Sequence, residues 1–182
     1  MLEKNNHRHN RIIAEPNKVI NGQALQRCSK MRFGLRTLAT VGSGVIAVYN
    51  LLMLLNMKPV LAEITRELYI KARTPLGIWG TRPLGLFRYF SSHYIPVNLE
   101  RDFDAFCEKF TSGFCGIIVY RTGKGAFSIP HAAAIENDRG KIYVYNRFPA
   151  LGKSYEFSSP EFAADKKKFI VGYYINAEDF VR

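Results

Sequence analysis

The first half of the chain carries apolar residues at helical spacing. Residues 43–56 are almost wholly apolar, which indicates a buried helix, and Pro59 ends it. Residues 60–73 place apolar side chains three or four positions apart and predict an amphipathic second helix. A third helix is expected over residues 84–93, because Pro83 suits its first turn.

The second half changes to the pattern of strands. Residues 100–111 still predict an amphipathic helix, since their phenylalanines recur at helical spacing. Runs rich in β-branched and aromatic residues follow, and residues 137–140 form a tight-turn signal between two of them. The expected strands cover residues 95–99, 115–120, 129–136, 141–146 and 168–176. Helices followed by antiparallel strands predict an α+β fold, with a helical half packed on the sheet.

Residues 1–22 differ from the rest of the chain. They are rich in Asn, His and Arg and contain turn signals, so we expect an extended or disordered basic arm. Residues 23–182 are then expected to form a single domain. A chain of 182 residues with 47% hydrophobic residues can build one core but is short for two.

The net charge of +11 brings anionic partners into consideration. Residues 1–36 hold eight Lys or Arg against two Glu, which is +6 of this total. No recognition helix or zinc spacing accompanies the charge, so nucleic acid is not the expected partner. Residues 39–57 approach the length of a bilayer span, but Tyr49 and Asn50 would lie mid-bilayer. We expect a buried helix there; a membrane anchor and a membrane-surface role for the basic arm are the alternatives.

The cysteines and the first residues indicate a cytoplasmic protein. Cys28, Cys107 and Cys115 are odd in number and widely spaced, which fits free thiols better than a disulfide framework or a metal site. No apolar core follows the first residues closely, so no signal peptide is expected. No cofactor and no metal are predicted, and the oligomeric state is left open.

Three polar residues stand where predicted elements begin or end. Ser43 lies between two glycines at the start of the apolar helix, where unpaired N–H groups favour negative charge. His131 opens one strand of a predicted hairpin and Asn146 closes the next, so strand pairing brings them near each other. An imidazole oriented by an Asn side chain is the base of Cys-His-Asn sites. Each residue also has a structural interpretation, as a helix cap, a core histidine or a turn residue.

This order of elements resembles the papain-like cysteine peptidases of the bacteriocin-leader (C39) type. In that family a Cys-Gly pair begins an apolar helix, a His opens a later strand, and an Asp or Asn closes the hairpin. The matching positions here are Ser43-Gly44, His131 in PHAAAI and Asn146 in YNR. The resemblance covers roughly residues 23–175.

The resemblance implies a papain-like fold and a peptide or protein as substrate or ligand. It also implies an oxyanion held by the Gly44 N–H and by a glutamine upstream of the nucleophile. Gln26 is the predicted glutamine, and Gln23 is the other one in this region.

The chain departs from the family at the nucleophile, where a serine replaces the cysteine. A thiol beside a histidine at a helix start can be largely thiolate, whereas a hydroxyl must lose its proton during attack. Three interpretations follow: a serine hydrolase on the same scaffold, a non-catalytic relative that keeps the peptide groove, or a replacement that traps an inactive form. The leading prediction is a peptidase-type domain with the triad Ser43, His131 and Asn146. The alternative is a non-catalytic peptide- or protein-binding module.

Overall fold

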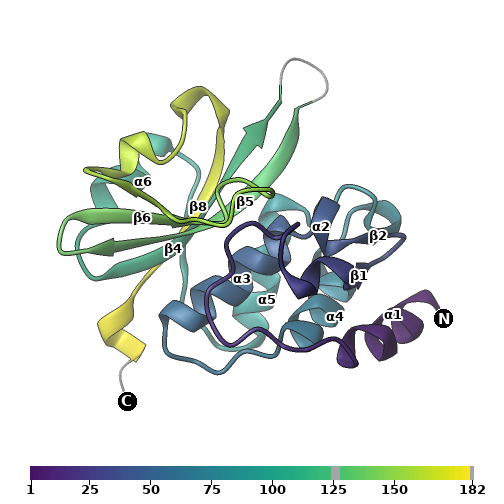
Figure 1. Cartoon of the computed structure of the whole chain (residues 1–182). Helices are drawn as coiled ribbons and strands as arrows, with labels where there is room; N and C mark the ends of the chain where they lie inside the picture. The colour runs from purple at the N-terminus through teal and green to yellow at the C-terminus, as the bar shows by residue number, and fades with distance from the viewer. Residues whose placement is uncertain (124–127, 181–182) are drawn as a thin grey trace.

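The computed structural model describes residues 1–123 and 128–180 and has an α+β fold (Figure 1). Most helices belong to the first half of the chain and the main sheet to the second half, as the sequence predicts. The α-helices are α1 (Leu2–Arg11), α2 (Leu38–Val41), α3 (Ser43–Leu54), α4 (Leu61–Ala72), α5 (Leu86–Ser92) and α6 (Phe103–Lys109). Short 3₁₀ helices are η1 (Arg27–Lys30), η2 (Pro75–Gly77), η3 (Pro83–Gly85), η5 (Pro160–Phe162), η6 (Lys166–Lys168) and η7 (Ala177–Phe180).

The strands form a small hairpin and one larger sheet. The hairpin pairs β1 (Arg32–Phe33) with β2 (Arg36–Thr37). The larger sheet is antiparallel, in the order β3-β8-β4-β5-β6-β7. Its strands are β3 (Asn98–Glu100), β4 (Phe114–Thr122), β5 (Ile129–Asp138), β6 (Lys141–Tyr145), β7 (Tyr155–Phe157) and β8 (Phe169–Asn176). The sequence did not predict β1, β2 or β7, whose two or three residues show no clear alternation, whereas the equally short β3 overlaps the strand expected over residues 95–99.

The β5–β6 hairpin fixes the register near the candidate site. Asp138 pairs with Lys141, so the turn consists of Arg139 and Gly140, whose φ values are 52° and 85°. Two successive positive φ values give the turn twist that suits paired strands. The ladder ends where Ala134 faces Tyr145.

Helix α3 is the centre of the helical half. Residues 44–52 are all buried, which explains why this run is almost wholly apolar. Two polar residues within the run, Tyr49 and Asn50, anchor the chain that precedes η1: the Tyr49 hydroxyl donates to Pro16 O at 2.6 Å, and Asn50 forms two hydrogen bonds with the Ile20 backbone. In the described ranges, no helix is both long enough and apolar enough to cross a membrane.

The main sheet carries a core on each face. On one face, Ile117 and Val119 of β4 pack in the same cluster as α3 and α4. On the other face, Ile118 packs in a cluster with Phe106 of α6. Because both faces of β4 are buried, its sequence is continuously apolar and does not alternate between apolar and polar residues.

The first half of residues 1–22 is a helix and not the extended or disordered arm that the sequence predicts. Leu2–Arg11 forms α1, which packs on α4 (Figure 1). Its buried residues are Asn6 and Asn10, one helical turn apart, and they hydrogen-bond to the backbone of Gly34 and Arg32. The helix was missed because its buried positions are polar and leave no apolar stripe to detect.

Candidate functional site

Close packing around two glycines places Ser43 at the start of α3. A Cβ on Gly42 would lie 2.5 Å from Leu38 O, and a Cβ on Gly44 would lie 2.0 Å from the Thr81 Oγ1. Both positions therefore require glycine for close approach. The half-buried Ser43 side chain accepts a hydrogen bond from the Ala132 N–H at 3.3 Å, which joins the start of α3 to β5.

His131 lies on β5, directly before Ala132, and is only 6% exposed. Its Nε2 is 2.8 Å from the carbonyl oxygen of Asn146. A carbonyl oxygen can only accept, so Nε2 carries the ring proton and Nδ1 keeps its lone pair in the neutral form. Burial lowers the pKa of His131, while the hydrogen bond to Asn146 acts in the opposite direction. The net lowering favours the neutral imidazole that a general base requires.

Asn146 contacts His131 through its backbone and not, as predicted, through its side chain. The fully buried side chain pairs instead with Gln23: Oδ1 accepts from the Gln23 N–H at 3.0 Å, and Nδ2 donates to the Gln23 Oε1 at 2.8 Å. The Asn146 N–H donates to the Asn21 Oδ1 at 2.8 Å. The residue has φ 58°, which turns the chain out of the β6 ladder and aims its carbonyl at His131.

Neither upstream glutamine offers a free side-chain amide at the site. Gln26 does not line the cavity that Ser43 faces, and its amide donates to Asn21 O at 3.2 Å. Gln23 lines that cavity, but its amide donates to Leu38 O and Ala39 O. Gly44 is buried in the first turn of α3, where helical N–H groups lack an intrahelical partner. Gln26 thus lies outside the cavity with its amide hydrogen-bonded elsewhere, and the oxyanion roles of Gln26 and Gly44 stay predictions.

Ser43 and His131 line one cavity of about 260 Å³. Its walls come from α2 and α3 on one side, from β5 on the other, and from the loop between α4 and α5. Trp79 and Phe148 stand at this cavity with 59% and 44% of their surface exposed. Arg147 also lines it, and its guanidinium stacks on Phe157 at 4.5 Å. The cavity is thus mainly apolar, with one cationic group.

Sequence reasoning did not find three parts of this arrangement. The Gln23–Asn146 pair joins residues 123 positions apart, and no local pattern marks it. The Trp79–Thr81 segment also lines the cavity but shows no regular periodicity. Arg147 and Phe148 line it as well, and they lie just beyond the end of the predicted strand 141–146. Gln23 is only 1% exposed, and its neighbours in the sequence give no sign that its side chain is buried.

Outside this cavity, a metal site and reactive thiols are the other chemistry to consider among the described residues. No group of three His, Cys, Asp or Glu side chains is placed there to hold a metal ion. Cys28, Cys107 and Cys115 are all buried and unpaired by disulfides, and burial raises the pKa of each thiol, to about 11 for Cys28 and about 12 for the other two. None of the three lines the cavity.

A scan against protein-family models matches none of them, and a search of curated proteins finds no match. The chemistry of the site therefore rests on its own geometry.

Proposed function

We propose that the cavity binds a peptide or another acyl compound in a papain-like manner and that Ser43 attacks its carbonyl carbon. The supporting observation is the hydrogen bond from His131 Nε2 to the Asn146 carbonyl at 2.8 Å. It fixes the tautomer whose Nδ1 can accept a proton, on a residue that shares the cavity with Ser43. The Ser43 oxygen accepts from Ala132, which leaves its own proton available for transfer.

In this proposal His131 accepts the hydroxyl proton as the Ser43 oxygen bonds to the carbonyl carbon. The same proton then passes to the leaving amine, and water releases the acyl group in a second round of acid–base catalysis. The N–H groups of the first turn of α3, those of Ser43 and Gly44, are proposed to stabilise the oxyanion. Asn146 acts as the orienting residue, through its carbonyl.

The cavity walls favour a substrate with an apolar side chain. Trp79 and Phe148 offer aromatic surface, and Arg147 can pair with a carboxylate of the bound compound. A peptide ester with an apolar side chain and a free carboxylate is therefore the substrate class to assay first.

Labelling with a serine-directed fluorophosphonate tests the proposal. We expect labelling of the wild-type protein, none of Ser43→Ala, and labelling slowed about 100-fold or more in His131→Gln, because general-base catalysis is lost. Ser92→Ala is the matched control: Ser92 also contacts a basic side chain, Lys71 Nζ at 2.7 Å, but lies outside the cavity. Equal labelling of Ser43→Ala and wild type would contradict a nucleophilic Ser43.

A second candidate is a peptide-binding module without chemistry. The observation that favours it is the hydrogen bond that Ser43 accepts from Ala132, together with the lack of one to His131 among the described residues. Peptide binding that survives Ser43→Ala, with no labelling of the wild type, would favour this candidate over the hydrolase.

A further inference from the structure

Nearly all of the net positive charge of the chain lies in its first, mainly helical half. Residues 1–93 contain 14 Lys or Arg and four Asp or Glu, whereas residues 94–182 contain 12 and 11. The first segment therefore carries +10 of the net +11, although the cavity described above uses none of these cations. A charge so unevenly distributed creates a field that attracts anionic partners to one side of a protein.

A hollow at the end of α4 concentrates this charge. It has a volume of about 260 Å³ and is bordered by Lys71, Arg73, Arg82 and Arg88, with no Asp or Glu among its lining residues. These residues come from α4, the loop after it and α5, so the fold gathers them from three elements. We call this site the cationic hollow.

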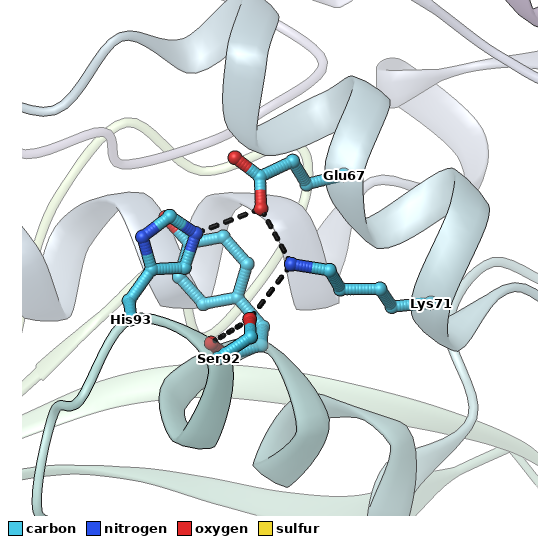
Figure 2. A network of polar contacts seen from close by, with 5 residues as sticks. Glu67, Lys71, Ser92 and His93 are labelled. Carbon is cyan, nitrogen blue, oxygen red and sulfur yellow. Dashed lines mark hydrogen bonds and ion pairs between the residues drawn. The ribbon is translucent and has the colours of Figure 1, made fainter.

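Three of its four cations have no carboxylate partner among the residues that the structure describes. Lys71 Nζ donates to Glu67 at 2.8 Å and to the Ser92 hydroxyl oxygen at 2.7 Å. Figure 2 shows that His93 contacts the same Glu67 oxygen. Within the described part of the chain, Arg73, Arg82 and Arg88 form no ion pair. Arg73 only donates to Tyr69 O and stacks on that ring at 4.6 Å. Clustered guanidinium groups repel one another unless an anion lies between them.

Exposed aliphatic side chains stand beside these cations. Ile70 and Leu76 both line the cationic hollow and are each 54% exposed. Leu35, at the tip of the β1–β2 hairpin, is 59% exposed, and its N–H donates to Leu76 O at 3.3 Å, so the two turn tips are adjacent. Leu76 has φ 51°, a left-handed conformation that costs a leucine about 1 kcal/mol, yet its side chain is not used in the core.

We propose that this face binds the surface of an anionic membrane. Lipid phosphates occupy the cationic hollow, and the leucines of the two turn tips enter the interface between headgroups and acyl chains. A membrane fits better than an acidic peptide because Leu35 and Leu76 are exposed at adjacent turn tips beside the arginines of the cationic hollow, so apolar and cationic groups share one exposed face. Lys and Arg near an anionic leaflet, with aliphatic side chains beside them, are the pattern of interfacial binding.

Vesicle co-sedimentation of the full chain tests this proposal. One set of vesicles contains phosphatidylcholine alone, and the other contains phosphatidylcholine and phosphatidylglycerol in equal amounts. We expect binding only to the second set, weakened by salt. The triple variant Arg73→Gln, Arg82→Gln and Arg88→Gln should bind about 100-fold more weakly, since each cation near an anionic surface contributes about fivefold.

Two further variants make the test specific. Changing Lys153, Lys167 and Lys168 to Gln removes the same charge from the sheet half, and this control should bind as the wild type does. The pair Leu35→Ser and Leu76→Ser should weaken binding while leaving the salt dependence unchanged, because it removes only apolar contacts.

Several results would overturn the proposal. These are no binding to anionic vesicles, equal losses in the arginine and lysine triple variants, or binding to polyglutamate or duplex DNA but not to vesicles. Binding of inorganic phosphate to the protein, without binding of the protein to vesicles, would assign the hollow to a free anion instead. Ser43→Ala should bind vesicles normally, so failure of the hydrolase proposal does not decide this one.

Discussion

Replacing Asn146 by alanine tests the polar cluster that holds the candidate base. Asn146 is fully buried and makes four hydrogen bonds, two with its side chain and two with its backbone. Alanine removes the two side-chain bonds, and the Gln23 N–H and Gln23 Oε1 lose their partners in the core. The backbone bonds to Asn21 and His131 are then held less firmly.

The expected loss follows from these contacts. Each buried polar group left unpaired costs about 1–3 kcal/mol, so the two together cost about 2–6 kcal/mol. A left-handed φ of 58° adds about 1 kcal/mol for alanine, because asparagine tolerates this conformation better. Asn146→Ala should therefore lower the free energy of unfolding by about 3–7 kcal/mol. Asn146→Gly should lose about 1 kcal/mol less, since glycine accepts positive φ freely.

Urea unfolding monitored by circular dichroism measures these changes. Asn56→Ala is the matched control, because Asn56 has φ 55° but is exposed and makes no side-chain hydrogen bond within the described residues. It isolates the conformational cost. A loss in Asn146→Ala no larger than that in Asn56→Ala would refute the idea that the Gln23–Asn146 pair stabilises this region.

Further predictions concern the site itself. In Ser43→Cys, iodoacetamide should alkylate the new thiol at neutral pH while the three native thiols react slowly, because their raised pKa lowers the thiolate fraction about 100-fold or more. Equal modification of all four cysteines, measured by mass spectrometry, would contradict this. The wild type should lose stability relative to His131→Gln as the pH falls below 6.5, since the lowered pKa of His131 lets the unfolded chain take up a proton first. Parallel stability–pH curves would exclude this titration. Gly44→Ala should lower the free energy of unfolding by about 1–3 kcal/mol, because the added methyl group overpacks against Thr81. Adding Thr81→Ala should restore part of this loss, as measured by thermal unfolding. Additive losses in the double variant would argue against this contact.

Local periodicity was enough to predict most of the elements near the site. The apolar run of α3, the stripe of α4 and the β5–β6 hairpin each leave a repeating pattern within about ten residues of sequence. The order of these elements was also enough to predict an α+β fold, because strands that follow one another with tight turns pair antiparallel.

The failures have a common origin in polar contacts between distant segments. Helix α1 is fixed by Asn6 and Asn10, whose partners lie 28 and 22 positions away, and a polar face of this kind has no apolar signature. No pattern in the sequence distinguishes Gln23, whose side chain is buried, from Gln26, whose side chain is only half-buried. The structure places Gln23 against the Leu38 and Ala39 carbonyls at the start of α2, and against Asn146.

The sequence by itself determined the longer helices and strands whose apolar residues recur regularly, but not α1, β1, β2 or β7, and it marked Ser43, His131 and Asn146 as candidates. Tertiary structure decided how those residues meet: Ser43 and His131 line one cavity, and Asn146 reaches the imidazole with its carbonyl rather than its amide. The physical reason is that burial of apolar surface follows local periodicity, whereas a hydrogen bond depends on the position and direction of single atoms. Those directions are set only when segments from both halves of the chain pack together.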